Sequence, residues 1–204
     1  MTYAELYQII LDFAVDSEPT FAGHIPDFVR AAEKRIYQDA DLTATQLAAA
    51  PAVTLNVATV TMPPDFLSVD SFAVTVAGEM IFLLPKSIDF LQTAYPTAAA
   101  TGTPRYYGVK DSLTLQLAPI PDATLVSQLR YFGYPPSIVD VSTTWLGDNF
   151  EFALQYGALR DAAVFLKEEA DVVAMYEAKY QEALAQVKAF GMIGRSDDYR
   201  RKAR

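Results

Sequence analysis

The chain has 204 residues, of which 51% are hydrophobic, and a formal charge of −9 at pH 7. This length allows one large domain or two small ones with a proper core. The negative charge argues against general nucleic-acid or membrane binding, because contacts with phosphate need an excess of Lys and Arg on one surface. The absence of cysteine excludes disulfides, a thiolate metal site and a cysteine nucleophile.

The N-terminal sequence Met-Thr-Tyr-Ala-Glu lacks the basic segment of a secretion signal. No apolar run approaches the roughly 20 residues that span a bilayer. We therefore expect a soluble protein that is made in the cytosol.

Two helices are predicted at the N-terminal end. Thr2 and Glu5 form a capping box ahead of apolar residues at helical spacing, which predicts a helix over 3–15. Pro26 suits the first turn of a second helix over 26–40, because the missing N–H of proline is unpaired at that position anyway. The two helices are expected to form a hairpin.

The middle of the chain changes from a helical to a strand-like pattern. The Ala- and Thr-rich segment 41–51 is interpreted as a frayed continuation of the second helix. From there Val53, Leu55 and Val57 alternate with polar residues, which indicates a strand. Further strands are predicted at Val60 and Met62 and over 67–76, 80–84, 106–109, 113–117 and 125–132.

Turn signals between these strands favour an antiparallel region. A reversal is predicted at 77–79, and Ser87 is expected to cap a short helix that runs to Tyr95. Residues 96–103 are expected to form a loop of small residues. Pro135 and Pro136 end the sheet, because successive prolines cannot continue a ladder.

A long helix is predicted to begin at Glu151. Asp148 and Glu151 have the spacing of a second capping box, in which each side chain bonds the backbone of the other. Two apolar stripes follow, so this helix should be buried over most of its circumference and lie in the middle of a packed unit.

A second C-terminal helix is predicted after the polar turn 167–171. Its single apolar stripe over 172–190 indicates an outer helix, antiparallel to the preceding one because the turn is short. Gly191 and Gly194 suit a left-handed stop, beyond which the chain is expected to be a tail.

The predicted fold class is α+β. Neither helix pair buries enough apolar surface to be stable alone, so we expect the two pairs to form one four-helix bundle. The bundle would consist of 1–50 and 141–190, a small antiparallel β-domain would be inserted at 51–140, and 191–204 would form a basic C-terminal arm.

The residues that carry enzyme chemistry are sparse. The single histidine, His24, precedes Pro26 and is interpreted as a loop or cap residue. The adjacent acids Glu168–Glu169 and Asp197–Asp198 point apart on a helix and are interpreted as solvated charges. No glycine-rich phosphate loop or metal-ligand motif is present. We expect no enzyme, no cofactor and no metal.

The arm differs in charge from the rest of the chain. Residues 191–204 hold five basic and two acidic side chains, which gives this segment a charge of +3. Because the whole chain carries −9, residues 1–190 carry −12. Two interpretations stay open: a solubilising end, or an arm that becomes ordered on docking to another subunit. The candidate docking residues are Arg195, Tyr199, Arg200, Arg201, Lys202 and Arg204.

Several short segments are similar in order and spacing to one protein family. The chain resembles the head-to-tail adaptor, or connector, proteins of short-tailed bacteriophages. The segments that carry the resemblance are 25–33 (IPDFVRAAE), 62–67 (MPPDFL), 101–107 (TGTPRYY), 115–122, and 156–159 (YGAL) leading to 165–167 (FLK).

The resemblance implies a structural virion protein that forms a ring of twelve copies beneath the portal. Its arm would dock to the portal protein, and its outer surface and lower rim would receive tail, nozzle or fibre proteins. Genomic DNA would pass through the lumen during ejection without sequence-specific binding. The protein would reside in the neck of the virion and in the host cytoplasm during assembly.

Two other functions stay open from the sequence. Another neck or tail component, such as a tail-tube or completion protein, is compatible with the same order of helices and strands. A hydrolase of cell-wall glycan would need a Glu and an Asp about 5–10 Å apart across a cleft.

Overall fold

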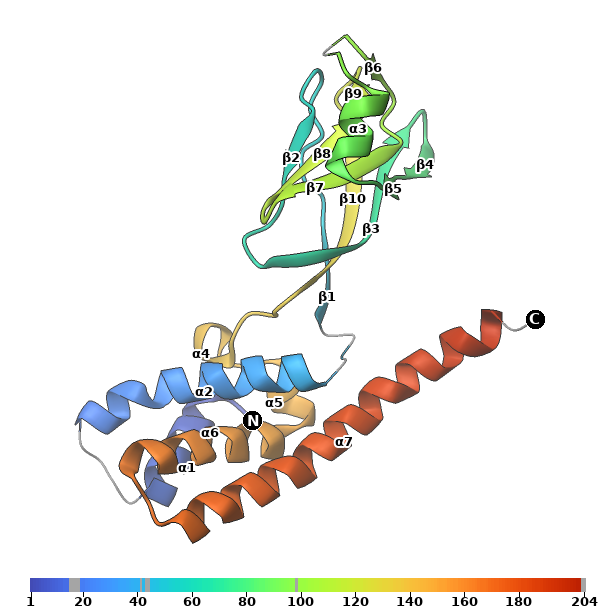
Figure 1. Cartoon of the computed structure of the whole chain (residues 1–204). Coiled ribbons are helices and arrows are strands. Elements are labelled where there is room, and N and C mark those ends of the chain that lie inside the picture. The colour runs from blue at the N-terminus through green and yellow to red at the C-terminus, as the bar shows by residue number, and fades with distance from the viewer. Residues whose placement is uncertain (15–18, 41, 43–44, 98, 203–204) are drawn as a thin grey trace. The chain divides into compact units, whose positions relative to one another are not determined.

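The computed structural model describes the whole chain except residues 15–18, 41, 43–44, 98 and 203–204, and for 192–202 it describes the backbone alone. The fold is mixed α+β, as predicted (Figure 1). The helices are α1 (Tyr3–Ala14), α2 (Pro19–Asp39), α3 (Ile88–Ala94), α4 (Ile138–Val141), α5 (Trp145–Asn149), α6 (Glu151–Leu166) and α7 (Ala170–Lys202). The strands are β1 (Gln46–Ala49), β2 (Thr59–Thr61), β3 (Phe66–Val76), β4 (Glu79–Phe82), β5 (Leu84–Pro85), β6 (Thr101–Gly102), β7 (Tyr106–Asp111), β8 (Thr114–Ala118), β9 (Ile120–Pro121) and β10 (Val126–Gly133).

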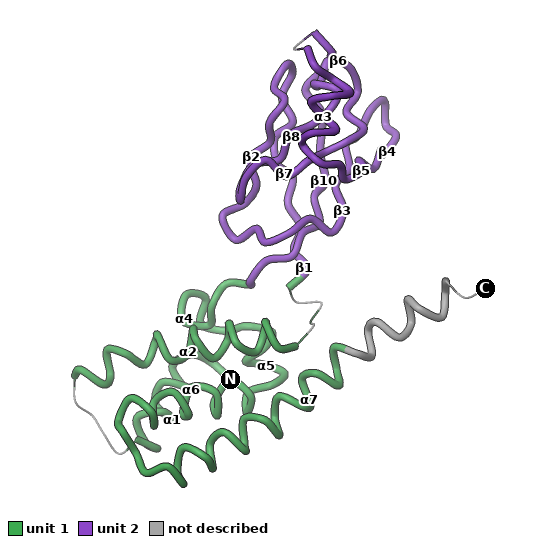
Figure 2. Tube along the Cα trace, viewed as in Figure 1, with its two compact units in different colours: residues 1–45, 135–204 green, residues 46–134 purple. Residues whose placement is uncertain are grey.

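The chain divides into two compact units, which Figure 2 shows in different colours. The helical unit comprises Met1–Thr45 and Pro135–Arg204, and the β-unit comprises Gln46–Tyr134. The two ends of the chain thus share one unit, and a single segment between them makes the other. That each unit folds as a separate domain stays a prediction.

Helix α6 is the centre of the helical unit. It packs against α1 and α2 from the N-terminal end and against α7 from the C-terminal end. Its buried residues lie on more than one face, because the sequence supplies two apolar stripes. They are Ala153, Leu154, Gln155, Gly157, Ala158, Leu159, Ala162 and Ala163.

Helices α2, α6 and α7 approach one another closely at Gly157. A Cβ atom at this position would lie 3.0 Å from the Cβ of Ala32 in α2 and 3.3 Å from the ring of Tyr180 in α7. A glycine is therefore needed where the three helices approach one another.

The start of α1 confirms the first capping box. The Thr2 N–H donates to the Glu5 carboxylate at 2.7 Å, and the Glu5 N–H donates to the Thr2 hydroxyl at 3.3 Å. The second helix begins earlier than predicted, at Pro19, and contains Pro26 in its interior. Pro19 supplies the first-turn proline, and burial of Phe21, Ile25 and Val29 outweighs the bond lost at Pro26. His24 consequently lies in a helix and not in a loop.

The predicted cap at Asp148 is wrong. α6 has no side-chain cap at its start, and the Asp148 carboxylate lies 3.5 Å from the Met1 nitrogen. A short helix, α5, precedes α6 and is capped by Thr144, whose hydroxyl accepts from the Gly147 N–H. The turn after α6 is confirmed: Lys167 is left-handed (φ 56°) and α7 starts three residues later.

The β-unit is built from two four-stranded sheets, β1-β10-β3-β4 and β2-β8-β7-β5, with a small β6-β9 pair. A cluster of apolar side chains from both larger sheets forms the core. α3 covers β7, where a Cβ at Gly108 would meet Ile88 and Leu91 at 3.0 Å. The core residues are Val53, Val60, Met62, Phe66, Phe72, Val74, Leu83, Tyr107, Leu115, Leu117, Leu129 and Tyr131.

Two predictions at the entry to this unit are wrong. Residues 46–49, interpreted as frayed helix, form β1, because pairing with β10 overrides the helical preference of alanine. The alternation at 53–57 does not make a strand: Val53 forms only an isolated bridge with Leu125. Asn56 is left-handed (φ 59°), and this turn ends the extended backbone.

The later hairpins follow the sequence pattern. β3 reverses into β4 at Ala77 and Gly78, both with positive φ (51° and 85°), as a tight antiparallel turn prefers. Ser87 caps α3 by accepting from the Phe90 N–H at 3.2 Å. The strand prediction over 125–132 corresponds to β10, the longest partner of β3.

Candidate interaction surfaces

The helix α7 extends through the segment predicted to be a tail. It runs to Lys202, so the predicted stop at Gly191 and Gly194 is wrong. Glycine costs a helix about 1 kcal/mol relative to alanine, and no proline follows to terminate it. The side chains of Arg195, Tyr199, Arg200, Arg201 and Lys202 lie outside the described residues, as does the whole of Arg204.

A cluster of three aromatic rings holds α7 just before this segment. Trp145 of α5, Phe150 between α5 and α6, and Phe190 of α7 have ring centroids 5.4–5.6 Å apart. Trp145 and Phe190 remain 36% and 46% exposed. The Trp145 cluster therefore anchors α7 at Phe190 against α5 and the start of α6.

Ion pairs connect α7 and α2 to the central helix. Arg35 of α2 donates to Asp161 of α6 at 2.7 and 3.0 Å, and Arg160 of α6 pairs with Glu177 of α7 at 2.6 Å. The Arg35 guanidinium also lies 5.7 Å from the ring centre of Tyr180. Burial raises the pKa of the Tyr180 hydroxyl to about 12.

A buried carboxylate joins α2 to α4. Glu33 is 4% exposed and accepts from the Ile138 N–H at 2.9 Å, at the start of α4. Burial raises the pKa of this carboxyl, against the opposing effect of hydrogen bonds from Ser137 and Ile138. Nearby, Arg30 donates to Asp140 at 2.8 Å. These contacts fix the segment through which the chain re-enters the helical unit.

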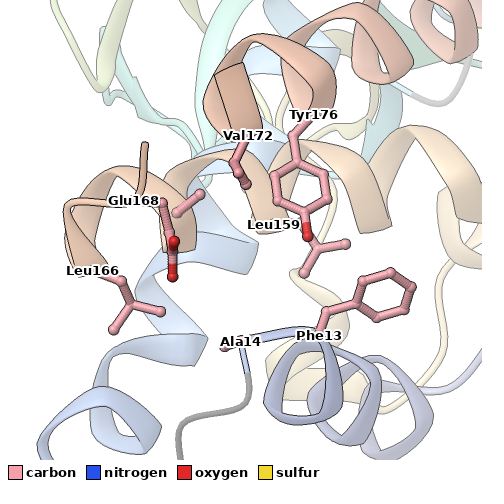
Figure 3. A pocket seen from close by; sticks show the side chains of 8 residues that line it. Phe13, Ala14, Leu159, Leu166, Glu168, Val172 and Tyr176 are labelled. Carbon is pink, nitrogen blue, oxygen red and sulfur yellow. The ribbon is translucent and has the colours of Figure 1, made fainter. Parts of the chain in front are cut away.

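An open pocket lies between α1, α6 and α7. Its volume is about 280 Å³, and Figure 3 shows Phe13, Leu159 and Tyr176 around it, with Glu168 on the side of the α6–α7 turn. Phe13 is 52% exposed. Apart from Glu168 and the Tyr176 hydroxyl the side chains are apolar, so the pocket fits an apolar group rather than a charged metabolite.

His24 lies in an aromatic environment at the surface. Its ring centroid is 5.1 Å from that of Phe165 and 6.4 Å from that of Phe28, and its Nδ1 is 3.5 Å from Asp27. This arrangement includes no nucleophile. Glu168 and Glu169 are both exposed, as expected for turn charges, and Asp197 and Asp198 lie outside the side chains described.

Within the described part of the chain, no group of three His, Asp or Glu side chains is arranged to bind a metal ion. Among the same residues, no helix has both the length and the apolar character needed to cross a membrane. The features that the described residues do show are exposed apolar side chains, surface pockets and a long C-terminal helix. They define a protein with interaction surfaces, of the kind found in structural assemblies.

The family comparison agrees with this class. The family model described as SU10 adaptor protein matches residues 1–204, the whole chain. The chain therefore belongs to the SU10 adaptor protein family and is a phage head-to-tail adaptor, as the resemblance predicted. No curated protein matches the chain.

Membership of this family has coarse consequences for function. A phage adaptor is a structural protein, which points away from an enzymatic role. It makes contacts with portal and tail proteins in general, and it belongs to the neck of the virion. The order and spacing of the short segments predicted this family from the sequence, although none of the segments is a catalytic motif.

Proposed function

We propose that the protein is one segment of a twelve-membered ring between the portal and the tail, and that it docks to the portal through residues 191–204. The helical unit would act in this ring as a four-helix bundle of α1, α2, α6 and α7. The β-unit and lower rim would form a platform for tail, nozzle or fibre proteins. Assembly would begin in the host cytoplasm.

The contrast in charge is the observation that supports portal docking. Residues 191–204 carry +3 and the rest of the chain carries −12. The candidate residues Arg195, Arg200, Arg201, Lys202 and Arg204 would pair with acidic grooves of the portal, with Tyr199 as an apolar anchor. Charge-assisted hydrogen bonds are roughly twice as strong as neutral ones, and a dozen arms add avidity.

The position of the arm supports the same assignment. α7 is held by the Trp145 cluster up to Phe190 and continues as helix to Lys202. An arm that is already helical loses less conformational entropy on docking than a disordered tail. The acidic body would suit a conduit for DNA, because a negative lumen repels the genome and lets it slide. A lumen rich in Lys or Arg in the assembled ring would refute this last point.

Deletion of 195–204 tests the portal assignment. The truncated protein should remain folded, since it retains every residue that is described as buried in the helical unit, from Leu6 to Val187. It should no longer bind portal in a pull-down. A point variant sharpens the result: Arg201→Glu should weaken portal binding at least ten-fold. Lys188→Glu is the matched control, because it changes the net charge equally but lies before the arm. Unchanged binding after the deletion would contradict the proposal.

A further inference from the structure

The segment that runs from β4 into β5 presents a row of apolar side chains to solvent. Along β4 and into β5, the alternate residues Met80, Phe82 and Leu84 are 50%, 61% and 57% exposed. Between them, Leu83 is only 4% exposed and Ile81 packs against the core. The row therefore lies on the outer side of a strand whose other side is part of the core.

β4 is a short edge strand that lacks the bulges, lysines and prolines which commonly protect such an edge from pairing. It ends the sheet β1-β10-β3-β4, and its pairing with β3 is regular, without a bulge. It contains no lysine or proline, and Glu79 is its only charge. Natural edge strands with this character offer their free N–H and C=O groups to another strand.

β1, at the opposite edge of the same sheet, is a suitable partner. It contains no charged residue, and its exposed side chains are small or uncharged, Gln46 and Ala48. Each neighbouring pair in the sheet is antiparallel, so β1 and β4 of one copy run in opposite directions. Placing the β4 edge of one copy beside the β1 edge of another therefore continues the antiparallel pattern.

We infer that β4 of one copy pairs with β1 of the next copy, which joins the sheets of successive copies. The inference rests on the proposed ring. Met80, Phe82 and Ala48 lie on one face, as the pairing through Thr75, Ala73 and Ser71 establishes. Among the registers that keep this face continuous, the one that overlaps all four residues of both strands sets Met80 opposite Ala48 and Phe82 opposite Gln46. Each pair then places a large side chain against a smaller one.

Charge favours a second copy as the occupant. Each copy carries −9, so two copies meet most easily where carboxylates are few. Glu79 is the only charged residue of the two strands that would pair. Interface cores are depleted of charged residues in the same way.

The area of the row indicates a weak contact that depends on ring closure. The exposed parts of Met80 and Phe82 amount to roughly 200 Å² per copy, about a quarter of the roughly 800 Å² of a stable interface. Isolated copies should therefore stay apart until the portal gathers them. Four strands per copy at about 4.8 Å spacing give twelve copies a closed sheet at least roughly 70 Å across, because strand tilt can only widen it, and this is enough to enclose a DNA duplex.

Cysteine pairs test the register, because the natural chain has none. In a full-length Met80→Cys, Ala48→Cys variant the two thiols of one copy lie three strands apart, about 14 Å, too far for a disulfide within the copy. Oxidation of the portal-bound or concentrated protein should give a ladder of covalent oligomers beyond the dimer. The matched control is Met80→Cys with Ala49→Cys, because Ala49 lies on the opposite face of the sheet from Ala48. This control variant should give no ladder of covalent oligomers.

A second pair of variants tests the edge itself. Phe82→Lys should reduce the number of copies on the portal at least ten-fold, because a lysine on an edge strand opposes pairing. Val126→Lys is the control: Val126 is 71% exposed on the same face but belongs to β10, away from the β4 edge. It should change assembly by less than two-fold.

The outcomes separate this inference from the proposed function. Portal binding without a ladder in either sample would overturn the β4–β1 pairing and leave portal docking intact. A ladder in the concentrated protein without portal binding would support the pairing and contradict the docking proposal. A covalent dimer from Met80→Cys alone, without the second cysteine, would show a two-fold β4–β4 contact and overturn the head-to-tail arrangement.

Discussion

The two units of this adaptor build their interiors in different ways. The helical unit joins segments from both ends of the chain, and it does so with a glycine contact, a buried carboxylate and ion pairs. The β-unit comes from one continuous segment and has an apolar core between two sheets. Both units bury apolar side chains, and the helical unit adds ion pairs and a buried carboxylate between segments that are distant in the chain. The following changes should affect one unit and spare the other.

The largest expected effect is Phe72→Ala in the β-unit. Phe72 is 1% exposed and packs edge-to-face against Tyr107 at 6.1 Å between ring centroids. Its removal should lower the free energy of unfolding of the β-unit by about 3–5 kcal/mol. Hydrogen exchange should rise in peptides of 46–134 and remain unchanged in α1 and α6. An equal rise in both units would contradict the separate-folding prediction.

The control for that experiment is Phe82→Ala. This side chain is 61% exposed in the isolated chain, so its truncation should cost less than about 1 kcal/mol. Any larger loss of stability would mean that Phe82 is part of the core.

A smaller effect is expected from Gly157→Leu in the helical unit. The new side chain would meet Ala32 and Tyr180, and overpacking of this kind costs about 1–3 kcal/mol. The single tryptophan, Trp145, lies in the helical unit, so its fluorescence during denaturation should report the loss there.

Gly23→Ala is the matched control for Gly157→Leu. A Cβ at Gly23 meets no atom within 4 Å, and alanine is about 1 kcal/mol more favourable than glycine inside a helix. This variant should therefore stabilise the helical unit by up to about 1 kcal/mol. If Gly157→Leu and Gly23→Ala both destabilised the helical unit, the close contact at Gly157 would not explain the loss of stability in Gly157→Leu.

The smallest effect concerns the pH dependence contributed by Glu33. Its pKa is higher in the folded protein than the ordinary 4.5, so the folded state holds the proton more tightly. The stability contributed by this group is present below the unfolded pKa and is lost as the pH rises through the folded pKa. Glu33→Gln cannot ionise, so its free energy of unfolding should fall less than that of the natural protein as the pH rises above the ordinary carboxyl pKa of 4.5.

Urea denaturation at several pH values measures this difference. Glu33→Ala is the comparison that removes the acceptor for the Ile138 N–H, and it should cost about 1–2 kcal/mol at about pH 4, with a smaller cost at higher pH because this variant also cannot ionise. Parallel pH curves for the natural protein and Glu33→Gln would rule out a contribution from this carboxyl.

Local signals in the sequence predicted the elements that are stabilised locally. The Thr2–Glu5 capping box marked the start of α1, Ser87 marked α3, and the turn at 77–79 marked the β3–β4 hairpin. The two apolar stripes of α6 also predicted its central place, because stripe width reports how much of a helix is buried.

The errors fall where distant contacts decide the structure. The sequence of β1 favours a helix, but pairing with β10 makes it a strand. The sequence around Asp148 favours a helix cap, but its carboxylate lies beside the Met1 nitrogen instead. Gly191 permits a helix to end but does not require it, so the sequence alone did not reveal the length of α7. The β4 edge was predicted as a strand, but its exposure follows only from the sheet order.

An image of the virion neck by electron cryomicroscopy tests the central claim most directly. It should show a ring of twelve copies beneath the portal, with helices from both ends of each chain in one bundle and the carboxyl end of α7 inserted into the portal. A ring in which residues 191–204 point away from the portal, or the absence of the protein from the neck, would contradict the account.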